Sequence, residues 1–489
     1  MTVQESAATP APGIDAHRNH RWFALIVLCL GVLMIVLDTT IVNVALPSIK
    51  ADLGFTETSL AWVVNAYMLT YGGFLLLGGR LGDLYGHRRF FLVGITLFTL
   101  ASLACGLAQS QTFLVAARAI QGLGGATVTA VALSLIMDLF SEPADRAKAM
   151  GVYGFVCAGG GSIGVLLGGL LTGTLNWHWI FLVNLPIGVL VFALSLWLLP
   201  AGIKASATRS LDIAGAVTVT TSIMLATYAI VNGNEAGWTS VQTLGLLGAA
   251  AALLATFLVI ESRIASPLMP LGLFRLRNVA VANVVGVFWA AAMFAWFFLS
   301  ALYMQLVLGY APMQVGMAFL PSNLIMAAFS LGLSAKIVMR FGIRLPLFVG
   351  LMLAAVGLLL FARAPVDGKL LTDVLPGMVL LGLGAGMAFN PVLMAAMSEV
   401  GPEDSGLASG VVNTSFMMGG SLGLAVLASL AASRAARSAL EGLDRAASLA
   451  AGYRVAFFVG ALFAAFAAVF GGALLRTRDA LRTAEAGAH

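Results

Sequence analysis

Hydrophobic residues gather along this chain in fourteen long segments, which short polar stretches separate. Each segment covers about 20 residues or more and lacks the alternation of polar and apolar positions that is typical of a membrane β-strand. Because a helix rises 1.5 Å per residue, about 20 residues cross the hydrocarbon core of a bilayer. We therefore expect transmembrane helices at residues 22–47, 58–79, 89–108, 112–138, 147–172, 178–199, 211–232, 241–262, 278–302, 313–336, 342–364, 371–396, 404–431 and 451–475.

The composition indicates a surface that mostly meets lipid. Of the 489 residues, 60% are hydrophobic and 10% are charged, whereas soluble domains carry about 25% charged residues. So few charges cannot cover a globular protein in water, and we predict an all-α integral membrane protein of the cell membrane, plasma or inner. The net charge of +5 comes from basic residues scattered over short loops, which excludes a nucleic-acid-binding patch.

Lysine and arginine residues distinguish the two sides of the membrane. With the N-terminus in the cytoplasm, 18 of the 26 basic residues fall in cytoplasmic segments and 7 in external ones. This bias predicts an even number of spans and two cytoplasmic tails, at residues 1–21 and 476–489. We expect the chain to act as a monomer.

A faint internal repeat divides the chain. The loops after the second and the tenth span can be aligned on Gly86 and Gly342, which also places Arg88 on Arg344. Repeated halves are typical of secondary transporters, whose substrate site lies where the halves meet. Because the second copy begins two spans late, we predict two six-helix bundles with two transmembrane helices inserted between them. The predicted parts are 22–200, 201–265 and 266–475.

Two charged residues stand well inside predicted spans, away from the span ends. Asp38 follows sixteen uncharged residues of the first span, and Arg118 is the only basic residue well inside a span. A carboxylate in the membrane costs roughly 2.5–3.5 kcal/mol on insertion scales, and a guanidinium does not lose its proton in practice. Each group must therefore face protein or water. A buried acid that gains and loses a proton is typical of a proton-driven transporter.

Three motifs in the first third of the chain are specific when taken together. They are the segment Asp38 to Pro47 in the first span, Gly79, Asp83, Gly86 and Arg88 in the following cytoplasmic loop, and Arg118, Gln121 and Gly124 in the fourth span. In this combination they resemble the signatures of the major facilitator superfamily, and in particular of its fourteen-span branch, the drug/proton antiporters.

This resemblance implies roles for the charged residues. Asp38 and Arg118 would share one polar zone of a central cavity, where Asp38 couples the proton and Arg118 tunes it. The guanidinium favours the ionised acid and burial favours the neutral one, so opening the cavity would change the balance. The loop around Asp83 would dock the two bundles when the cytoplasmic side is shut. The alternatives are a static ion pair and an ordinary positive-inside loop.

The fifth predicted span has a face of glycine residues that resembles the antiporter motif of drug exporters. Glycines about four residues apart allow two helices to approach closely. Val165 stands where that motif normally has proline, so the expected kink is absent. The glycines are Gly160, Gly164, Gly168 and Gly169.

Aromatic and amide side chains within the spans are candidate substrate contacts. They suit a flat, lipophilic compound that is cationic or neutral. Taken singly, each such residue is more often a packing residue or an anchor at the membrane interface. The thirteenth span is apolar at Phe416 and Met417, where relatives often carry polar residues, which predicts an apolar cavity. The candidates are Asn43, Trp62, Tyr67, Gln121, Trp289, Trp296, Asn390 and Asn413.

The sequence thus predicts a proton-driven secondary transporter that exports lipophilic drugs or antibiotics by alternating access. The phosphate-binding Gly-Lys-Ser/Thr loop of ATP-driven proteins is missing, so we expect the proton gradient as the energy source and no cofactor or metal. One alternative is an exporter of the same fold whose cargo is an endogenous lipid, peptide, amino acid or self-made antibiotic. A membrane enzyme or a channel is the other, although the sequence has neither a catalytic cluster nor a continuous polar stripe.

Overall fold

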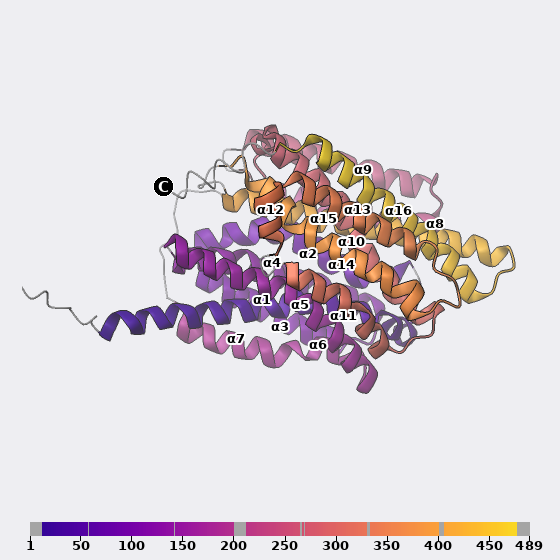
Figure 1. The fold of residues 1–489 in the computed structure, drawn as a ribbon, viewed down its shortest axis with the longest axis horizontal. Coiled ribbons are helices and arrows are strands. Elements are labelled where there is room, and N and C mark those ends of the chain that lie inside the picture. The colour runs from indigo at the N-terminus through magenta and orange to yellow at the C-terminus, as the bar shows by residue number, and fades with distance from the viewer. Residues whose placement is uncertain are drawn as a thin grey trace, which may run out of the picture.

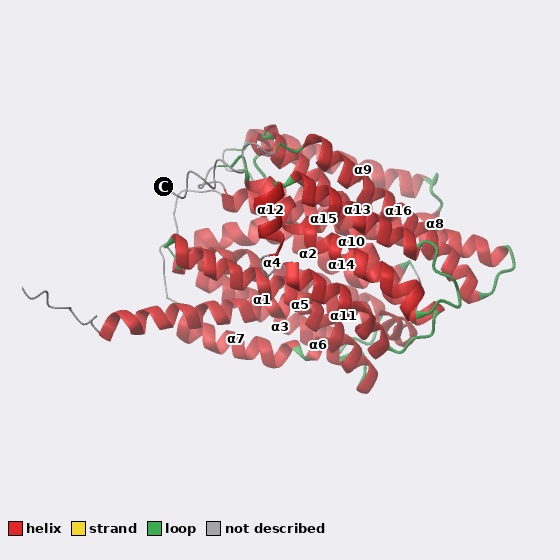
Figure 2. Cartoon of the chain, viewed as in Figure 1, coloured by secondary structure: helices red, strands yellow, loops and turns green. Residues whose placement is uncertain are grey.

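The computed structural model describes residues 12–56, 58–140, 142–199, 212–264, 267, 269–329, 333–400 and 405–476. Within these ranges the chain is almost entirely helical and has no strand (Figure 2). The predicted all-α class is therefore confirmed. A helix satisfies its own backbone donors and acceptors, which is what the interior of a bilayer requires.

Long helices joined by short turns make up the first half of the chain. They are α1 (Pro12–Leu53), the 3-10 turn η1 (Ser59–Ala61), α2 (Trp62–Tyr85), α3 (His87–Gly106), α4 (Gln111–Leu139), α5 (Pro143–Thr174), α6 (Trp179–Leu182) and α7 (Asn184–Leu198). Turn residues cap them: Ser110, for example, accepts a hydrogen bond from the backbone N–H of Phe113 at 3.3 Å and begins α4.

The remaining helices follow the same pattern. They are α8 (Ile213–Ala236), α9 (Val241–Arg263), the 3-10 turn η2 (Leu271–Arg275), α10 (Arg277–Leu302), the π-turn η3 (Tyr303–Val307), α11 (Pro312–Ala328), α12 (Ser334–Phe341), α13 (Arg344–Phe361), the π-turn η5 (Leu370–Val374), α14 (Leu375–Met397), α15 (Ser405–Leu440) and α16 (Arg445–Leu474).

Eleven helical stretches in the described part of the chain are long and apolar enough to cross a membrane. The spans predicted at 58–79, 147–172 and 313–336 coincide with α2, α5 and α11, which are not among these eleven. A count of fourteen spans therefore stays a prediction.

The span predicted at 178–199 is a broken helix. The single turn α6 ends at Leu182, and α7 begins at Asn184. Pro186 explains the break, because proline has no N–H to donate to the carbonyl of Leu182 and is tolerated in the first turn of a helix. Val183, the residue between α6 and α7, keeps helical φ and ψ angles, so the two segments together still form one apolar stretch from Trp179 to Leu198.

The helices pack in two groups that follow the sequence (Figure 1). In the first group α5 and α7 pack on α1, while α2 and α3 pack on α4. In the second, α15 and α16 pack on α10, and α13 and α11 pack on α14. The groups meet mainly where α5 contacts α11 and α2 contacts α15. The predicted bundle boundaries at 200–201 and 265–266 lie outside the described residues, so the division there stays a prediction.

The loops that the sequence repeat aligns have matching geometry. Gly86 and Gly342 both adopt positive φ, 100° and 72°, at a sharp turn between two helices. Such angles favour glycine, because other side chains rarely adopt them. The aligned arginines also match: Arg88 donates to the carbonyl of Leu196 in α7, and Arg344 donates to the carbonyl of Gly472 in α16. Each arginine thus joins its turn to the last helix of its own group.

The helices α8 and α9 lie beside the seam between the two groups. Helix α8 packs on α9 and also contacts α2 and α15, one helix from each group. Asn234 in α8 donates to the carbonyl of Ser429 in α15 at 2.8 Å. The ring of Tyr228 in α8 lies 6.3 Å from that of Trp62, measured between centroids.

Candidate functional site

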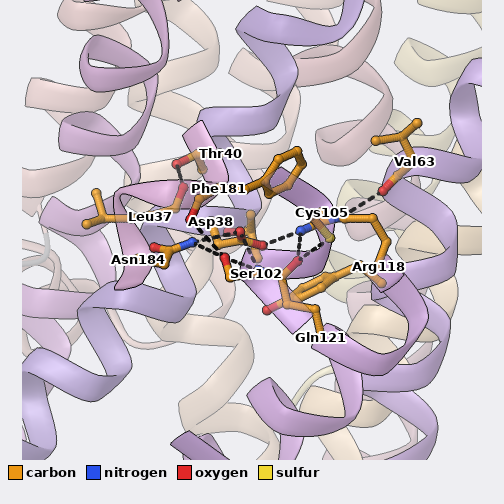
Figure 3. A network of polar contacts seen from close by, with 12 residues as sticks. Leu37, Asp38, Thr40, Val63, Ser102, Cys105, Arg118, Gln121, Phe181 and Asn184 are labelled. Carbon is orange, nitrogen blue, oxygen red and sulfur yellow. Dashed lines mark hydrogen bonds and ion pairs between the residues drawn. The ribbon is translucent and has the colours of Figure 1, made fainter. Parts of the chain in front are cut away.

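Asp38 of α1 and Arg118 of α4 form a fully buried ion pair (Figure 3). Arg118 Nη1 donates to Asp38 Oδ2 at 2.5 Å, and neither residue has any exposed surface. The two charged residues that the sequence singles out within spans, 80 positions apart, are therefore direct neighbours.

The second oxygen of Asp38 is held by neutral side chains. Asp38 Oδ1 accepts hydrogen bonds from Gln121 Nε2 at 2.8 Å and from Asn184 Nδ2 at 3.2 Å. The same two amides donate to Ser102 Oγ at 3.1 and 2.9 Å, and Ser102 donates to the carbonyl of Phe181 at 3.0 Å. These side chains, together with Arg118, are called the Asp38 network below; they come from α1, α3, α4 and α7.

Arg118 is surrounded by acceptors and rings. Its Nε donates to the carbonyl of Val63 at 3.0 Å, and its Nη1 also donates to Gln121 Oε1 at 2.7 Å. Its guanidinium carbon lies 4.4 Å from the centre of the Tyr67 ring and 5.5 Å from that of Phe181. Cation–π contacts of this kind stabilise a desolvated guanidinium by about 2 kcal/mol.

The network depends on the ion pair between Asp38 and Arg118. Removing one partner of a buried ion pair leaves the other charge uncompensated and costs about 3–5 kcal/mol. A proton on Asp38 removes the negative charge that faces Arg118, and it therefore changes the force between α1 and α4. Among the described residues, no group of three or more His, Cys, Asp or Glu side chains could hold a metal ion.

The glycine face of α5 packs on the turn of α1 that bears Asp38. A Cβ atom at Gly164 would lie 2.8 Å from the carbonyl oxygen of Leu37, and one at Gly168 would lie 2.6 Å from that of Ile41. At Gly160 it would lie 3.0 Å from side-chain atoms of α1. These positions leave no room for a side chain, so α5 and α1 lie backbone against backbone on either side of Asp38.

The next glycine of this face reaches the second group of helices. A Cβ atom at Gly169 would lie 2.8 Å from the carbonyl oxygen of Pro312, at the start of α11. Val165, where the antiporter motif normally has proline, is fully buried within α5. The motif therefore lies between Asp38 and the other half of the molecule.

The signature loop joins α2 to α3. Gly79 faces α4, where a Cβ atom would lie 3.7 Å from that of Ala130. His87 Nδ1 lies 2.8 Å from Asp138 Oδ2 across the turn. The side chain of Asp83 lies outside the described residues, so its predicted gating role stays a prediction.

A model of the Major Facilitator Superfamily matches residues 28–424 of the chain. This chain belongs to the Major Facilitator Superfamily. The family predicted from the three motifs is therefore confirmed. Members of this superfamily are transporters, and the fold and the membrane-crossing helices agree with that.

Relatives within the superfamily are named for antibiotics. The puromycin resistance protein pur8 of Streptomyces alboniger is 38% identical over 466 residues, 94% of this chain and 91% of the relative. The cephamycin export protein CmcT of Amycolatopsis lactamdurans is 40% identical over 422 residues, 86% of each chain. The multidrug resistance protein Stp of Mycobacterium tuberculosis is 38% identical over 424 residues, 86% of this chain and 78% of the relative.

Solved transporters share the fold at low identity. An inward-facing bacterial homologue of the lysosomal transporter Spinster superposes with a TM-score of 0.65 at 17% identity, over 95% of this chain and 98% of that one. The xylose transporter XylE from E. coli, in an inward-open conformation, gives 0.61 at 15% identity, over 95% and 99%.

Within this major facilitator transporter, the candidate substrate residues lie in several different local surroundings. Tyr67 and Gln121 belong to the surroundings of Arg118 described above, and Asn43 donates to carbonyls of its own helix. Asn390 and Asn413 are partly exposed on α14 and α15, as is Trp62 at the start of α2. The role of each as a substrate contact stays a prediction.

Three buried nitrogen donors of the second half have no hydrogen-bond partner among the described residues. Trp289 and Trp296, both predicted candidates, lie on one face of α10, and their indole Nε1 atoms are unpaired. Asn323 of α11 has an unpaired Nδ2, and its helix neighbour Phe319 lies 6.1 Å from the ring of Trp296. An unpaired buried donor costs about 1–3 kcal/mol, so a bound acceptor would stabilise each of them.

The sequence did not single out two members of the Asp38 network. Ser102 and Asn184 are uncharged and lie in apolar segments, where such residues usually pack without a function. Asn184 had one weak signal, an amide two residues before Pro186 in a predicted span. Only the folded chain shows that both side chains face Asp38.

Proposed function

We propose that this transporter exports a lipophilic drug or antibiotic, neutral or cationic, in exchange for protons. The observation that carries the proposal is the buried Asp38–Arg118 pair, because an acid with no exposed surface can exchange its proton only when the protein changes shape. The relatives named for resistance to or export of antibiotics support the direction and the class of cargo.

In this mechanism a proton from outside binds Asp38 and frees Arg118 from α1. Helix α1 also contacts the second half of the molecule, where Gln305 Nε2 donates to the carbonyl of Val44 at 2.9 Å. Val44 lies six residues beyond Asp38 on the same helix. A movement of α1 when Asp38 is protonated therefore alters the contact between the two halves of the molecule, as alternating access requires.

The proposal includes a topology. Fourteen spans, arranged as two six-helix bundles with α8 and α9 inserted, place both termini in the cytoplasm of a cell whose plasma or inner membrane holds the transporter as a monomer. The loop charges support this orientation. The matched turns at Gly86 and Gly342 support the two bundles. Labelling of single cysteines in each loop by a membrane-impermeant reagent tests the topology.

The cargo is expected to be aromatic and to bear hydrogen-bond acceptors. The unpaired donors of Trp289, Trp296 and Asn323 support acceptors such as carbonyl or ether oxygens. A second candidate cargo is a compound that the cell itself makes. The relatives named for single antibiotics, such as the tetracenomycin C resistance and export protein of Streptomyces glaucescens, favour it. A panel of puromycin, lincomycin, tetracenomycin C and cell extract separates the two.

The test uses purified transporter in proteoliposomes with an imposed pH gradient. Labelled puromycin or ethidium is the transported compound that is measured. We expect Asp38→Asn to abolish accumulation driven by the gradient and to retain gradient-free counterflow, which a channel cannot show. The matched control is Asp367→Asn, which makes the same change on an exposed loop residue and leaves transport intact. Full gradient-driven transport by Asp38→Asn would refute the proposal.

A further inference from the structure

A pocket of about 450 Å³ opens at the end of α1 that lies opposite the N-terminus. Three turns form it: the end of α1, the connection from α3 to α4, and the connection from α5 to α6. Its lining includes Asp52, Gly106, Gln109, Asn176, His178 and Leu182. In the proposed orientation this pocket faces the outside of the cell.

His178 is held in this pocket so that one nitrogen faces an acid. Its Nδ1 lies 3.0 Å from the carbonyl oxygen of Gly106, which can only accept, so Nδ1 bears the hydrogen. The free lone pair of the neutral ring is then on Nε2, which lies 3.9 Å from Asp52 Oδ2. Two acceptors thus face each other, and a proton on Nε2 would turn them into an ion pair.

Neighbouring groups fix both partners. The indole of Trp177 stacks on the His178 ring with 3.8 Å between centroids, and Trp177 Nε1 donates to Asp52 Oδ2 at 2.9 Å. The pocket residues from the α3–α4 connection and from α6 have no titratable side chain. On α1, Lys50 precedes Asp52 by two residues and does not line the pocket. Asp52 is therefore the charged group that His178 faces in the described pocket.

The pocket lies about one helical turn from the Asp38 network. Gly106 in its wall is four residues after Ser102 on α3, which is about 6 Å along the helix axis. The single turn α6 also joins the pocket to the network. His178 of the pocket directly precedes α6, and the carbonyl of Phe181 within α6 accepts a hydrogen bond from Ser102 of the network. Leu182, which lines the pocket, packs on Gly106 between α3 and α6.

We propose that this pocket is the external proton-loading site of the transporter. A proton from external water binds His178 Nε2 and forms an imidazolium paired with the Asp52 carboxylate. When α6 moves and the proton passes to the Asp38 carboxylate, His178 returns to its neutral form and the charge of Asp52 is unchanged. This inference rests on the proposed proton exchange, and it adds His178 and Asp52 as residues that deliver the proton without touching the cargo.

The test varies external pH at constant internal pH in proteoliposomes of uniform orientation, with puromycin or ethidium as the probe. We expect His178→Gln to remove the response of transport to external pH. Asp52→Asn, on a side chain 56% exposed, is expected to move that response to lower external pH, because the imidazolium loses its partner. The response to internal pH stays as in the wild type.

Two controls separate this inference from the proposed function. His20→Gln, an exposed residue at the other end of α1, is expected to leave the external profile unchanged. If His178→Gln and Asp52→Asn both keep the wild-type external profile while Asp38→Asn abolishes coupling, the loading site is wrong and proton exchange stands. If Asp38→Asn itself transports normally, the proposed function is wrong. Should His178→Gln fold poorly, the shift in Asp52→Asn decides the outcome.

Discussion

The two halves of this transporter differ in whether they bury charge. The first half buries Asp38 and Arg118 completely, and the amides of Gln121 and Asn184 donate to the remaining oxygen of Asp38. The described helices of the second half, from α10 onward, bury no charged side chain. Unpaired buried donors occur in both halves, for example Asn65 in the first and Trp289 and Trp296 in the second.

This difference supports a division of labour. In the proposed mechanism the Asp38 network responds to a proton, because a single charge change breaks its strongest contact. Unpaired donors respond instead to a ligand that brings acceptors, because the new hydrogen bonds remove the energetic cost of leaving those donors without a partner. The comparison suggests that proton coupling and cargo binding can be altered separately. The following variants address one or the other, from the largest expected effect to the smallest.

Arg118→Ala is expected to have the largest effect. It leaves the Asp38 carboxylate buried without its charge partner, which lowers the free energy of unfolding by about 3–5 kcal/mol and abolishes export. Thermal unfolding in detergent and efflux in vesicles measure the two consequences. The double variant Asp38→Ala with Arg118→Ala is expected to recover part of the stability but no export. Equal stability of the single and double variants would contradict a charge-paired network.

Gly164→Ala tests whether the close contact of α5 with α1 is needed. The added Cβ would lie 2.8 Å from the carbonyl oxygen of Leu37, so the helices must separate, at a cost of about 1–3 kcal/mol. Gly173→Ala is the matched control on the same helix, where a Cβ meets nothing within 4 Å. We expect slower export only in Gly164→Ala. Similar unfolding temperatures for both variants would show that the close approach is unimportant.

Trp296→Phe tests the binding side alone. It keeps an aromatic ring and removes the unpaired indole N–H, but the smaller ring leaves a cavity at this fully buried position, so the free energy of unfolding is expected to fall by about 1–2 kcal/mol. The apparent KM for an acceptor-bearing cargo is expected to rise by up to about tenfold, the equivalent of one hydrogen bond. Transport kinetics at several pH gradients provide the measurement. If transport by this variant depended differently on the pH gradient while KM stayed unaltered, Trp296 would belong to proton coupling instead.

Ser102→Ala is expected to have the smallest effect. Ser102 accepts from Gln121 and Asn184, and its loss lowers the free energy of unfolding by about 1 kcal/mol while the ion pair remains. Cys105→Ala is the control on the same helix, because it removes one buried sulfur atom and its weak contact to Gln121 at 3.6 Å but leaves the amide contacts of Asp38 in place. Chemical denaturation in detergent distinguishes the two. A loss of stability as large as that in Arg118→Ala would mean that the neutral side chains, and not the ion pair, stabilise the network.

The sequence was sufficient to identify residues whose burial in a membrane has a high energetic cost by itself. A charge inside an apolar segment must be compensated wherever it lies, so Asp38 and Arg118 stood out without any knowledge of the fold. Ser102 and Asn184 were missed because an uncharged polar residue in a membrane helix costs little and can satisfy itself on its own backbone. The roles of the candidates Trp62, Asn390 and Asn413 as substrate contacts stay predictions, because polar and aromatic residues in spans are more often packing residues or interfacial anchors.

The sequence by itself determined that the chain is helical, that it crosses a membrane many times, and which superfamily it belongs to. These properties follow from hydrophobic length, the placement of charge and short motifs, all of which are local. Only the tertiary structure decided that Arg118 contacts Asp38, that α5 presses on the same turn of α1, and that His178 faces Asp52. Those contacts join residues 80, more than 120 and 126 positions apart, and helix packing, not local propensity, selects the partners.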